Sequence, residues 1–257
     1  MNVEQHLPSS LLRPFIRSFT IISTSEETET LVLPHCGLVM ATQFRGKVRN
    51  QQDDGLQNIP SVVLSGMRKT WRRFRYEKDA GTLLITFTET GAASFFRAPV
   101  YELFEQYYSL DAFEPAAEVR KLEDRVASAS HNRQRIRVVE EFFLQRLNSS
   151  KQDSLVLNVI REIYQRHGAT DIRSLSTRFV LSQDAFEKRF RKLVGCTPKQ
   201  FSGIVRMKSL VSLAGQKKSL TELGYQFEFY DQSHFIREFR SFTGQSPREF
   251  FKAPYPW

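Results

Sequence analysis

The chain is poor in cysteine: its 257 residues include only Cys36 and Cys196, one in each half. Small secreted domains without a large core are usually held together by several disulfides, so this scarcity excludes a disulfide-stabilised fold. The two thiols need not pair. We therefore expect a reduced, cytoplasmic protein. The hydrophobic fraction of 40% predicts an ordinary apolar core.

Long hydrophobic runs are also missing. A membrane-spanning helix needs ~20 consecutive apolar residues, and no stretch of this sequence approaches that length. The first residues, MNVEQHLPSSLLRPF, have neither a basic start nor a continuous apolar segment, so we expect no signal peptide. The sequence therefore predicts no membrane partner.

Signatures of catalysis and of metal binding are absent from the sequence as well. It contains no glycine-rich phosphate loop, no nucleophile motif and no framed pair of catalytic carboxylates. Its five histidines lack metal-ligand spacing. The neighbours His35 and Cys36 suggest a metal site or a thiol sensor, but no further ligands accompany them, and a buried strand cysteine is the favoured interpretation. We expect no catalytic residue, no metal and no cofactor.

Positive charge is abundant and unevenly distributed. Residues 1–150 contain 19 Lys and Arg against 18 Asp and Glu, whereas residues 151–257 contain 18 against 10. The second segment thus carries +8 of the net charge of +9. Such segregation indicates a partner with many negative charges, either nucleic acid or an anionic membrane surface.

The hydrophobic period changes along the chain. Residues 8–97 contain short apolar and β-branched runs separated by turn residues, which predicts a small β-barrel or sandwich. From Pro99 onward the spacing is helical, beginning with Val100, Leu103 and Tyr107. The polar stretch 148–154 interrupts that period and predicts a linker. We expect an α+β protein with domains at 1–150 and 151–257, the second entirely helical.

A repeat occupies the second domain. The stretch SQDAFEKRFRKLVGCTPKQF at 182–201 aligns, at an offset of 49 residues, with DQSHFIREFRSFTGQSPREF at 231–250. Seven of the 20 aligned positions are identical, including the phenylalanines, the glycine and the proline. Two copies are too few for a solenoid, so the pattern predicts two copies of one supersecondary unit.

Each copy has the signals of a helix that follows a tight turn. Ser182 and Asp231 are typical N-cap residues, and Gly195 and Gly244 suit a left-handed C-terminal position. A helix-turn-helix unit places its second helix in the DNA major groove, where Arg, Lys and Gln bond base edges. With the phenylalanines facing the core, the outward base-reading candidates are Gln183, Asp184, Glu187, Lys188, Gln232, Ser233 and Arg237. The candidates for DNA phosphate contact are Arg191, Lys192, Lys199, Lys217, Lys218, Arg240 and Arg248.

Residues 155–252 resemble the AraC/XylS transcriptional regulators in both repeat stretches and in the near-50-residue spacing between them. The resemblance implies a seven-helix domain whose two helix-turn-helix units, joined by a long helix, enter adjacent major grooves of double-stranded DNA. It assigns base reading to Asp184, Glu187, Lys188, Gln232, Ser233 and Arg237. It also implies a bacterial regulator with RNA polymerase as a candidate partner.

Two positions depart from the family's pattern. Glu228 stands where the second turn usually has glycine, and Gly224 stands where it usually has alanine. A non-glycine residue in a left-handed turn is strained by about 1–3 kcal/mol. Asp184 and Glu187 are unusual too, because carboxylates near phosphates repel. They either accept a hydrogen bond from cytosine N4 or lie on the solvent side.

The first domain resembles the family more loosely. A cupin-like or barrel domain followed by helices implies effector sensing or dimerisation, so a small-molecule effector and a homodimer are candidate partners. A basic cluster is compatible with an anionic effector or with an ordinary solvated strand face, and it comprises Arg68, Lys69, Arg72, Arg73 and Arg75. The alternative functions are a cupin-like enzyme or ligand-binding protein with a basic helical accessory domain, and an adaptor.

Overall fold

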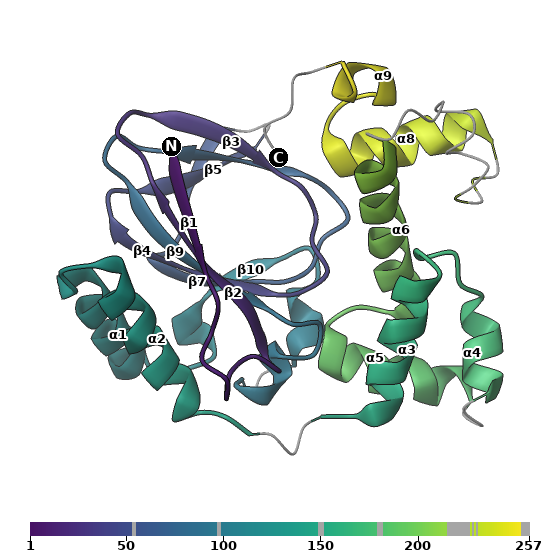
Figure 1. Ribbon diagram of the computed structural model, residues 1–257, viewed down its shortest axis with the longest axis horizontal. Helices are drawn as coiled ribbons and strands as arrows, with labels where there is room; N and C mark the ends of the chain where they lie inside the picture. Colours follow the sequence, from purple (N-terminus) through teal and green to yellow (C-terminus); the bar gives the residue numbers. More distant parts are fainter. Residues whose placement is uncertain are drawn as a thin grey trace.

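The computed structural model describes residues 1–52, 55–96, 99–148, 152–178, 182–214, 227, 229 and 231–252. In this part of the chain the strands lie within the first 109 residues, and the α-helices follow (Figure 1). The strands are β1 Asn2–His6, β2 Ile16–Ser23, β3 Thr28–Val32, β4 Val39–Arg45, β5 Val48–Gln52, β6 Gly55–Asn58, β7 Val62–Ser65, β8 Arg72–Tyr76, β9 Gly81–Phe87 and β10 Tyr107–Ser109. The helices are the short 3-10 helices η1 Ala92–Ser94, η2 Val100–Leu103 and η3 Leu110–Ala112, and α1 Ala116–Ser128, α2 Asn132–Leu144, α3 Ser154–Gln165, α4 Ile172–Arg178, α5 Gln183–Val194, α6 Pro198–Ala214, α8 Gln232–Thr243 and α9 Pro247–Phe250.

The strands form two antiparallel sheets. The larger sheet has the order β1-β2-β9-β4-β7-β10, and the smaller has the order β3-β8-β5-β6. Strand β9 lies at the centre of the larger sheet, where Ile85 pairs with Phe19 of β2 on one side and with Met40 of β4 on the other. The first part of the chain is therefore β-rich, as the short apolar runs of the sequence predicted.

Alternation along β9 assigns a different role to each face of the larger sheet. Leu83, Ile85 and Phe87 are fully buried in the main core on the outer face. The intervening side chains, Thr82, Leu84 and Thr86, point between the sheets and line a cavity there. Since successive strand residues face opposite sides, one strand builds both the helix-covered core and the cavity wall.

Helix α2 covers the outer face of the larger sheet. Its Phe143 ring is 5.4 Å from the Phe87 ring of β9 and 4.7 Å from the Phe95 ring beyond η1. Helix α1 packs beside α2 through Val119, Leu122 and Val126, all buried in the same core. An apolar stripe at helical spacing on each helix explains why both lie against the sheet.

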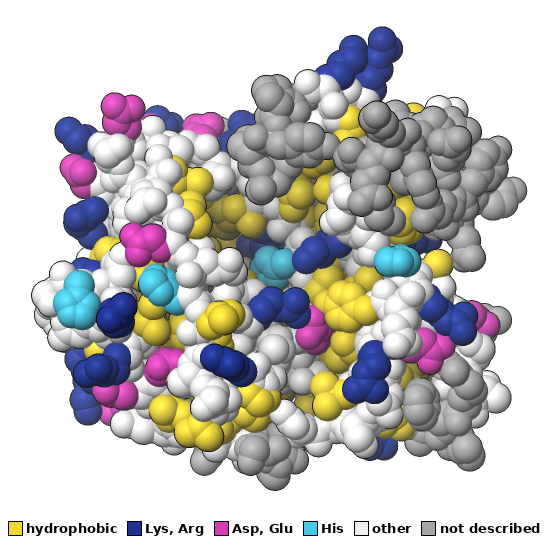
Figure 2. Space-filling model, in the orientation of Figure 1, with side chains coloured by type: hydrophobic (Ala, Val, Ile, Leu, Met, Phe, Trp, Pro, Cys, Tyr) yellow, Lys and Arg dark blue, Asp and Glu magenta, His cyan; other side chains and the backbone are white. Residues whose placement is uncertain are grey.

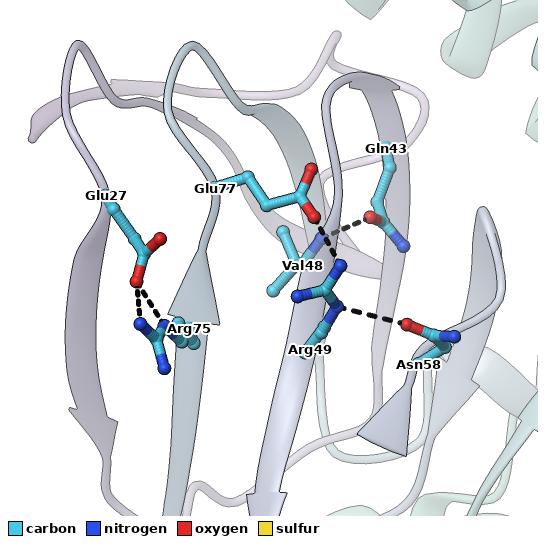
Figure 3. A network of polar contacts seen from close by, with 7 residues as sticks. All are labelled: Glu27, Gln43, Val48, Arg49, Asn58, Arg75 and Glu77. Atoms are coloured by element: carbon cyan, nitrogen blue, oxygen red, sulfur yellow. Dashed lines mark hydrogen bonds and ion pairs between the residues drawn. The ribbon is translucent and has the colours of Figure 1, made fainter. Parts of the chain in front are cut away.

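Polar contacts cross the outer side of the smaller sheet (Figure 3). Arg75 of β8 is paired with Glu27, which immediately precedes β3. Arg49 of β5 donates to Glu77 at 2.6 Å and to Asn58 of β6 at 3.2 Å. These partly exposed pairs connect adjacent strands, and each contributes at most about 1 kcal/mol.

The helical C-terminal part packs directly on the β-rich part. Helix α5 contacts η2 and η1, and a Cβ on Gly195 at its end would lie 2.9 Å from the Val100 carbonyl oxygen. The Tyr164 hydroxyl of α3 donates to Glu89, at 2.5 Å, and Glu89 is also paired with Arg17 of β2. The main apolar core is continuous through both parts.

The predicted fold class is confirmed: a β-rich N-terminal domain is followed by C-terminal helices. The helix predicted from Pro99 to Tyr107 is wrong beyond Leu103. Glu105 has a positive φ of 63°, which breaks the helical path, and Tyr107 then pairs with Ser65 as a strand. Pairing with a distant strand outweighed the local helical spacing. In the described residues no helix is both long and apolar enough to span a bilayer.

Candidate nucleic-acid interface

The two repeat stretches fold into closely matching helices. The Ser182 hydroxyl accepts a hydrogen bond from the Ala185 amide at 3.3 Å, and the Asp231 carboxylate accepts one from the His234 amide at 2.7 Å. Both helices have 12 residues. Gly195 ends α5 at a φ of 91°, and Gly244 ends α8 at a φ of 81°. Both predicted caps and both predicted left-handed glycines are confirmed.

Aromatic residues anchor these helices to the core. Phe186 and Phe190 of α5 are fully buried, as is Phe239 of α8. The Phe190 ring is 5.8 Å from the Phe201 ring of α6. The Phe239 ring is 5.3 Å from the ring of Phe250 in α9. Because the aromatic face of each helix is buried, the opposite face is fixed toward solvent.

The opposite faces present the predicted polar side chains. Gln183, Asp184 and Lys188 of α5 are exposed, while Glu187 is partly exposed and accepts a hydrogen bond from the Gln183 side-chain Nε2 at 3.3 Å. On α8, the three predicted base readers, Gln232, Ser233 and Arg237, are all exposed. Exposed side chains near the N-terminus of a helix are those that reach base edges when the helix enters the major groove.

Most of the predicted phosphate contacts are exposed basic residues around the same helices: Arg191, Lys192, Lys199, Arg240 and Arg248. The Arg191 guanidinium lies over the ring of Tyr101, 5.5 Å from its centre, on the side of α5 next to the N-terminal domain. Lys217, Lys218, Gly224 and Glu228 lie outside the described residues.

Comparisons with known proteins agree with this geometry. Residues 175–253 match the family described as a helix-turn-helix domain. They are an AraC-type helix-turn-helix domain. Residues 4–109 match a separate family, described as a domain of unknown function (DUF6597).

One curated relative and several solved structures are similar to this chain. The Msm operon regulatory protein of Streptococcus mutans is 29% identical over 119 residues, which cover 45% of this chain and 43% of that protein. The match therefore spans less than half of the relative's length. ToxT from Vibrio cholerae aligns over 99% of this chain and 100% of its own, at 11% identity and a TM-score of 0.46. The C-terminal domain of AraT from Geobacillus stearothermophilus aligns over 41% and 89%, at 14% identity and a TM-score of 0.37.

Sequence reasoning missed the contacts that join the C-terminal helices to one another. Asp153 caps α3 and also binds Arg189 of α5, with 2.5 Å between the Arg189 Nε and the Asp153 carboxylate. Burial raises the pKa of Asp153, but hydrogen bonds from Arg189 and from two backbone amides outweigh it, and the net pKa is lowered. An N-cap signal at Asp153 was readable from the sequence; its partner 36 residues later was not.

A second contact links α6 to α8. Arg206 is paired with Glu238 at 2.9 Å and lies over the ring of Phe229. His234 Nε2 is 3.4 Å from the same Glu238 carboxylate. The ring of His234 therefore lies beside a carboxylate one turn further along α8.

The cysteines are structural in this arrangement. Cys36 is buried, as expected, but it lies between β3 and β4 rather than in a strand. Burial raises the pKa of both the Cys36 and the Cys196 thiols, so both remain protonated at neutral pH. Within the described residues, no group of three or more His, Cys, Asp or Glu side chains is arranged to hold a metal ion.

Proposed function

We propose that this protein is a sequence-specific transcriptional regulator that reads two adjacent major-groove segments of double-stranded DNA with α5 and α8. Residues 1–150 form the sensing or dimerising domain, and residues 151–257 form the DNA-binding domain. One observation carries the proposal: two helices with the same caps and the same buried aromatic face present exposed polar side chains at corresponding positions.

Each helix has its own set of base-reading residues under this proposal. Gln183, Asp184, Glu187 and Lys188 face the bases from α5, and Gln232, Ser233 and Arg237 face them from α8. Exposed basic residues around the helices position the domain on the phosphates, supported by the +8 charge of residues 151–257. A small-molecule effector, a second copy of the chain and RNA polymerase are the partners through which such a regulator is controlled and acts, in the cytoplasm.

A cupin-like enzyme with a basic accessory domain is the competing proposal. The cavity between the sheets is the feature that favours it. However, the described residues that line the cavity include no Asp or Glu, and burial lowers the pKa of its histidine, His35, to about 3, which makes that ring a weak base at neutral pH. A ligand-binding role for the cavity fits these residues better than catalysis.

Selection from a pool of random duplex DNA by the purified full-length protein tests the proposal. We expect enrichment of two short sequence blocks about one helical turn (~10 bp) apart. The variant Lys188→Ala/Arg237→Ala removes one reader from each helix and should lose the enrichment. The matched control Arg133→Ala/Arg137→Ala removes the same charge from the exposed side of α2 and should keep it.

Other results of this selection contradict the proposal in different ways. Enrichment of a single block means that one helix alone reads bases. Equal enrichment by the Lys188→Ala/Arg237→Ala variant means that the reading face is misassigned. No enrichment at low salt by a folded protein rules out sequence-specific DNA binding and favours the ligand-binding alternative.

A further inference from the structure

The basic cluster of the N-terminal domain is divided between two faces of the smaller sheet. Along β8, Arg72, Phe74 and Tyr76 line the cavity between the sheets, whereas Arg73 and Arg75 alternate with them on the outer side. Arg75 is paired there with Glu27, as Figure 3 shows. The solvated-face interpretation therefore holds for Arg75, whereas two other members, Arg68 and Arg72, line the cavity.

Arg68 is the most deeply buried charge at the cavity. It is 3% exposed. Its Nε donates to the Thr70 carbonyl at 3.1 Å, and one terminal nitrogen donates to the Val32 carbonyl at 3.2 Å and the Leu33 carbonyl at 3.5 Å. A guanidinium has five N–H groups, and no described residue accepts from the other terminal nitrogen of Arg68. The carbonyls orient this cation without neutralising it.

The charge at this end of the cavity is incompletely balanced. No carboxylate of the described residues forms an ion pair with Arg68 or Arg72. Burial lowers the pKa of both guanidinium groups, and it outweighs the nearby Glu105 carboxylate, which raises the pKa of each. The Glu105 carboxylate accepts a hydrogen bond from the Lys69 amide at 2.8 Å, and its carbonyl accepts from Arg72 at 2.6 Å. One buried cation, Arg68, and one half-buried cation, Arg72, therefore share one nearby carboxylate, and an unpaired buried charge is costly.

His35 adds an unsatisfied polar atom. It lines the same cavity, and its Nδ1 is buried without a hydrogen-bond partner in the described structure. Burial, together with the neighbouring cations Arg68 and Lys208, lowers the pKa of His35 to about 3, so the ring is neutral at physiological pH. A neutral imidazole can donate a hydrogen bond to an anion or accept one from a protonated group.

The remaining walls are mostly apolar, with Gln43, Ser65, Thr82 and Thr86 as polar members, and the space is small. Val39, Ala41, Val63, Phe74 and Leu84 are among the lining residues, and the cavity volume is about 190 Å³. A cavity of roughly 150 Å³ holds benzene. The space thus suits a body of about one six-membered ring together with a charged group, and it is too small for a long acyl chain.

We propose that the cavity between the two sheets binds a small monocarboxylate with a compact apolar body, whose carboxylate is held by Arg68 and Arg72 beside His35. The apolar body lies among the side chains of β4, β7, β8 and β9. This inference deepens the proposed regulatory function, on which it rests for its biological role, by naming the chemical class of the effector.

Calorimetric titration of the full-length protein in the absence of DNA tests this assignment. The probes are cyclohexanecarboxylate, its neutral carboxamide and dodecanoate. We expect the carboxylate to bind at least about tenfold more tightly than the carboxamide, because a charge-assisted bond to a buried guanidinium is stronger than a neutral one. Dodecanoate should bind more weakly than cyclohexanecarboxylate because the cavity does not accommodate its chain.

Three variants distinguish the contribution of the Arg68 charge to ligand binding from the contribution of the cavity volume. Arg68→Met should weaken carboxylate binding at least about tenfold and leave carboxamide binding nearly unchanged. Ala41→Leu fills part of the cavity and should weaken both ligands alike. Arg73→Met, which removes a charge from the outer side of the same strand, is the matched control and should bind like the wild type.

The proposal is overturned if carboxylate and carboxamide bind equally, if dodecanoate binds more tightly than the compact acid, or if the folded wild type binds no compact carboxylate. Unchanged carboxylate binding by a folded Arg68→Met variant overturns the assignment of Arg68. Since the titration contains no DNA and the duplex selection contains no ligand, failure of one proposal is distinguishable from failure of the other.

Discussion

Lys188 and Arg237 hold corresponding positions on α5 and α8, each six residues after its N-cap and each exposed. Lys199 and Arg248 also correspond, each following the proline that begins the next helix. The repeat thus supplies one pair of candidate base readers and one pair of candidate phosphate contacts. The two roles differ in their dependence on sequence and on salt, so single substitutions separate them.

Arg237→Ala should relax specificity at one base position of the selected site. The expected cost on the preferred sequence is about 1–3 kcal/mol if Arg237 bonds a guanine edge, with little change on a duplex already altered at that position. Fluorescence anisotropy with a set of single-base variants of the duplex measures this. A uniform loss on every duplex would show that Arg237 contacts phosphate.

Lys199→Ala should weaken binding to all duplexes by a similar factor. Because a lost phosphate contact releases one counterion fewer, the slope of log K against log salt should also fall by about 1. The measurement is anisotropy between low and physiological salt, with Arg133→Ala on α2 as the control. A changed base preference in Lys199→Ala would contradict the phosphate assignment.

Asp153→Asn isolates the charge of the contact between α3 and α5. The amide retains an oxygen that can cap α3 but loses the ion pair with Arg189, so the free energy of unfolding should fall by about 0.5–1 kcal/mol at pH 7. The folded-state pKa of Asp153 is lowered, so this stabilisation is present above the unfolded pKa of about 3.9 and is lost as pH falls through the folded value.

Urea unfolding of the wild type and of Asp153→Asn at several pH values tests that linkage. The gap between the two proteins should close below about pH 4. A gap that stays constant from pH 7 to pH 3 would show that the carboxylate charge contributes nothing.

At the scale of elements, the sequence predicted best what depends on neighbouring residues. The N-caps Ser182 and Asp231, the left-handed glycines and the buried phenylalanine faces all follow from local signals, and the structure confirms them. Strand β10 and the partners of Arg68 could not be predicted, because they depend on contacts between residues that are far apart in the sequence. The inward direction of Arg72 follows from strand alternation only when the register of β8 is known.

Two glycines of the AraC-type domain should respond oppositely to alanine. Gly195→Ala places a side chain at a φ of 91°, with its Cβ 2.9 Å from the Val100 carbonyl, and should destabilise by at least about 1–3 kcal/mol. Gly203→Ala lies inside α6 with no atom within 4 Å of the new Cβ, and should stabilise by about 0.5–1 kcal/mol. Urea unfolding measures both; changes of the same sign would contradict the helix-end assignment.

At the scale of the whole molecule, the cavity is connected to the DNA-binding helices through short stretches of chain. The loop between β7 and β8 carries Arg68 and, three residues later, Trp71, whose ring contacts the backbone at the end of α8: a Cβ on Gly244 would lie 2.8 Å from it. Beside Arg68, His35 precedes the buried Cys36, whose neighbours include Tyr164 of α3 and Lys208 of α6. Acidic and basic side chains are interspersed on the face of the molecule shown in Figure 2.

Trp71→Ala should uncouple the two sites. Its ring joins the Arg68 loop to the end of α8, so its loss should leave carboxylate affinity within about twofold while abolishing the effect of the ligand on DNA affinity. Calorimetry without DNA gives the first quantity, and anisotropy with and without cyclohexanecarboxylate gives the second. An undiminished ligand effect on DNA binding would show that the coupling runs elsewhere, for which the Tyr164–Glu89 contact is the next candidate.

The central claim, that α5 and α8 read two adjacent major-groove segments on one face of DNA, is tested most directly by changing the spacing of the selected site. Anisotropy is measured on the enriched duplex and on versions with about 5 or about 10 extra base pairs between the two blocks. Because the two helices belong to one domain, the half-turn insertion, which rotates one block to the opposite face, should reduce affinity at least about a hundredfold, and the full-turn insertion should not restore it. Equal affinity for all three duplexes would contradict the account.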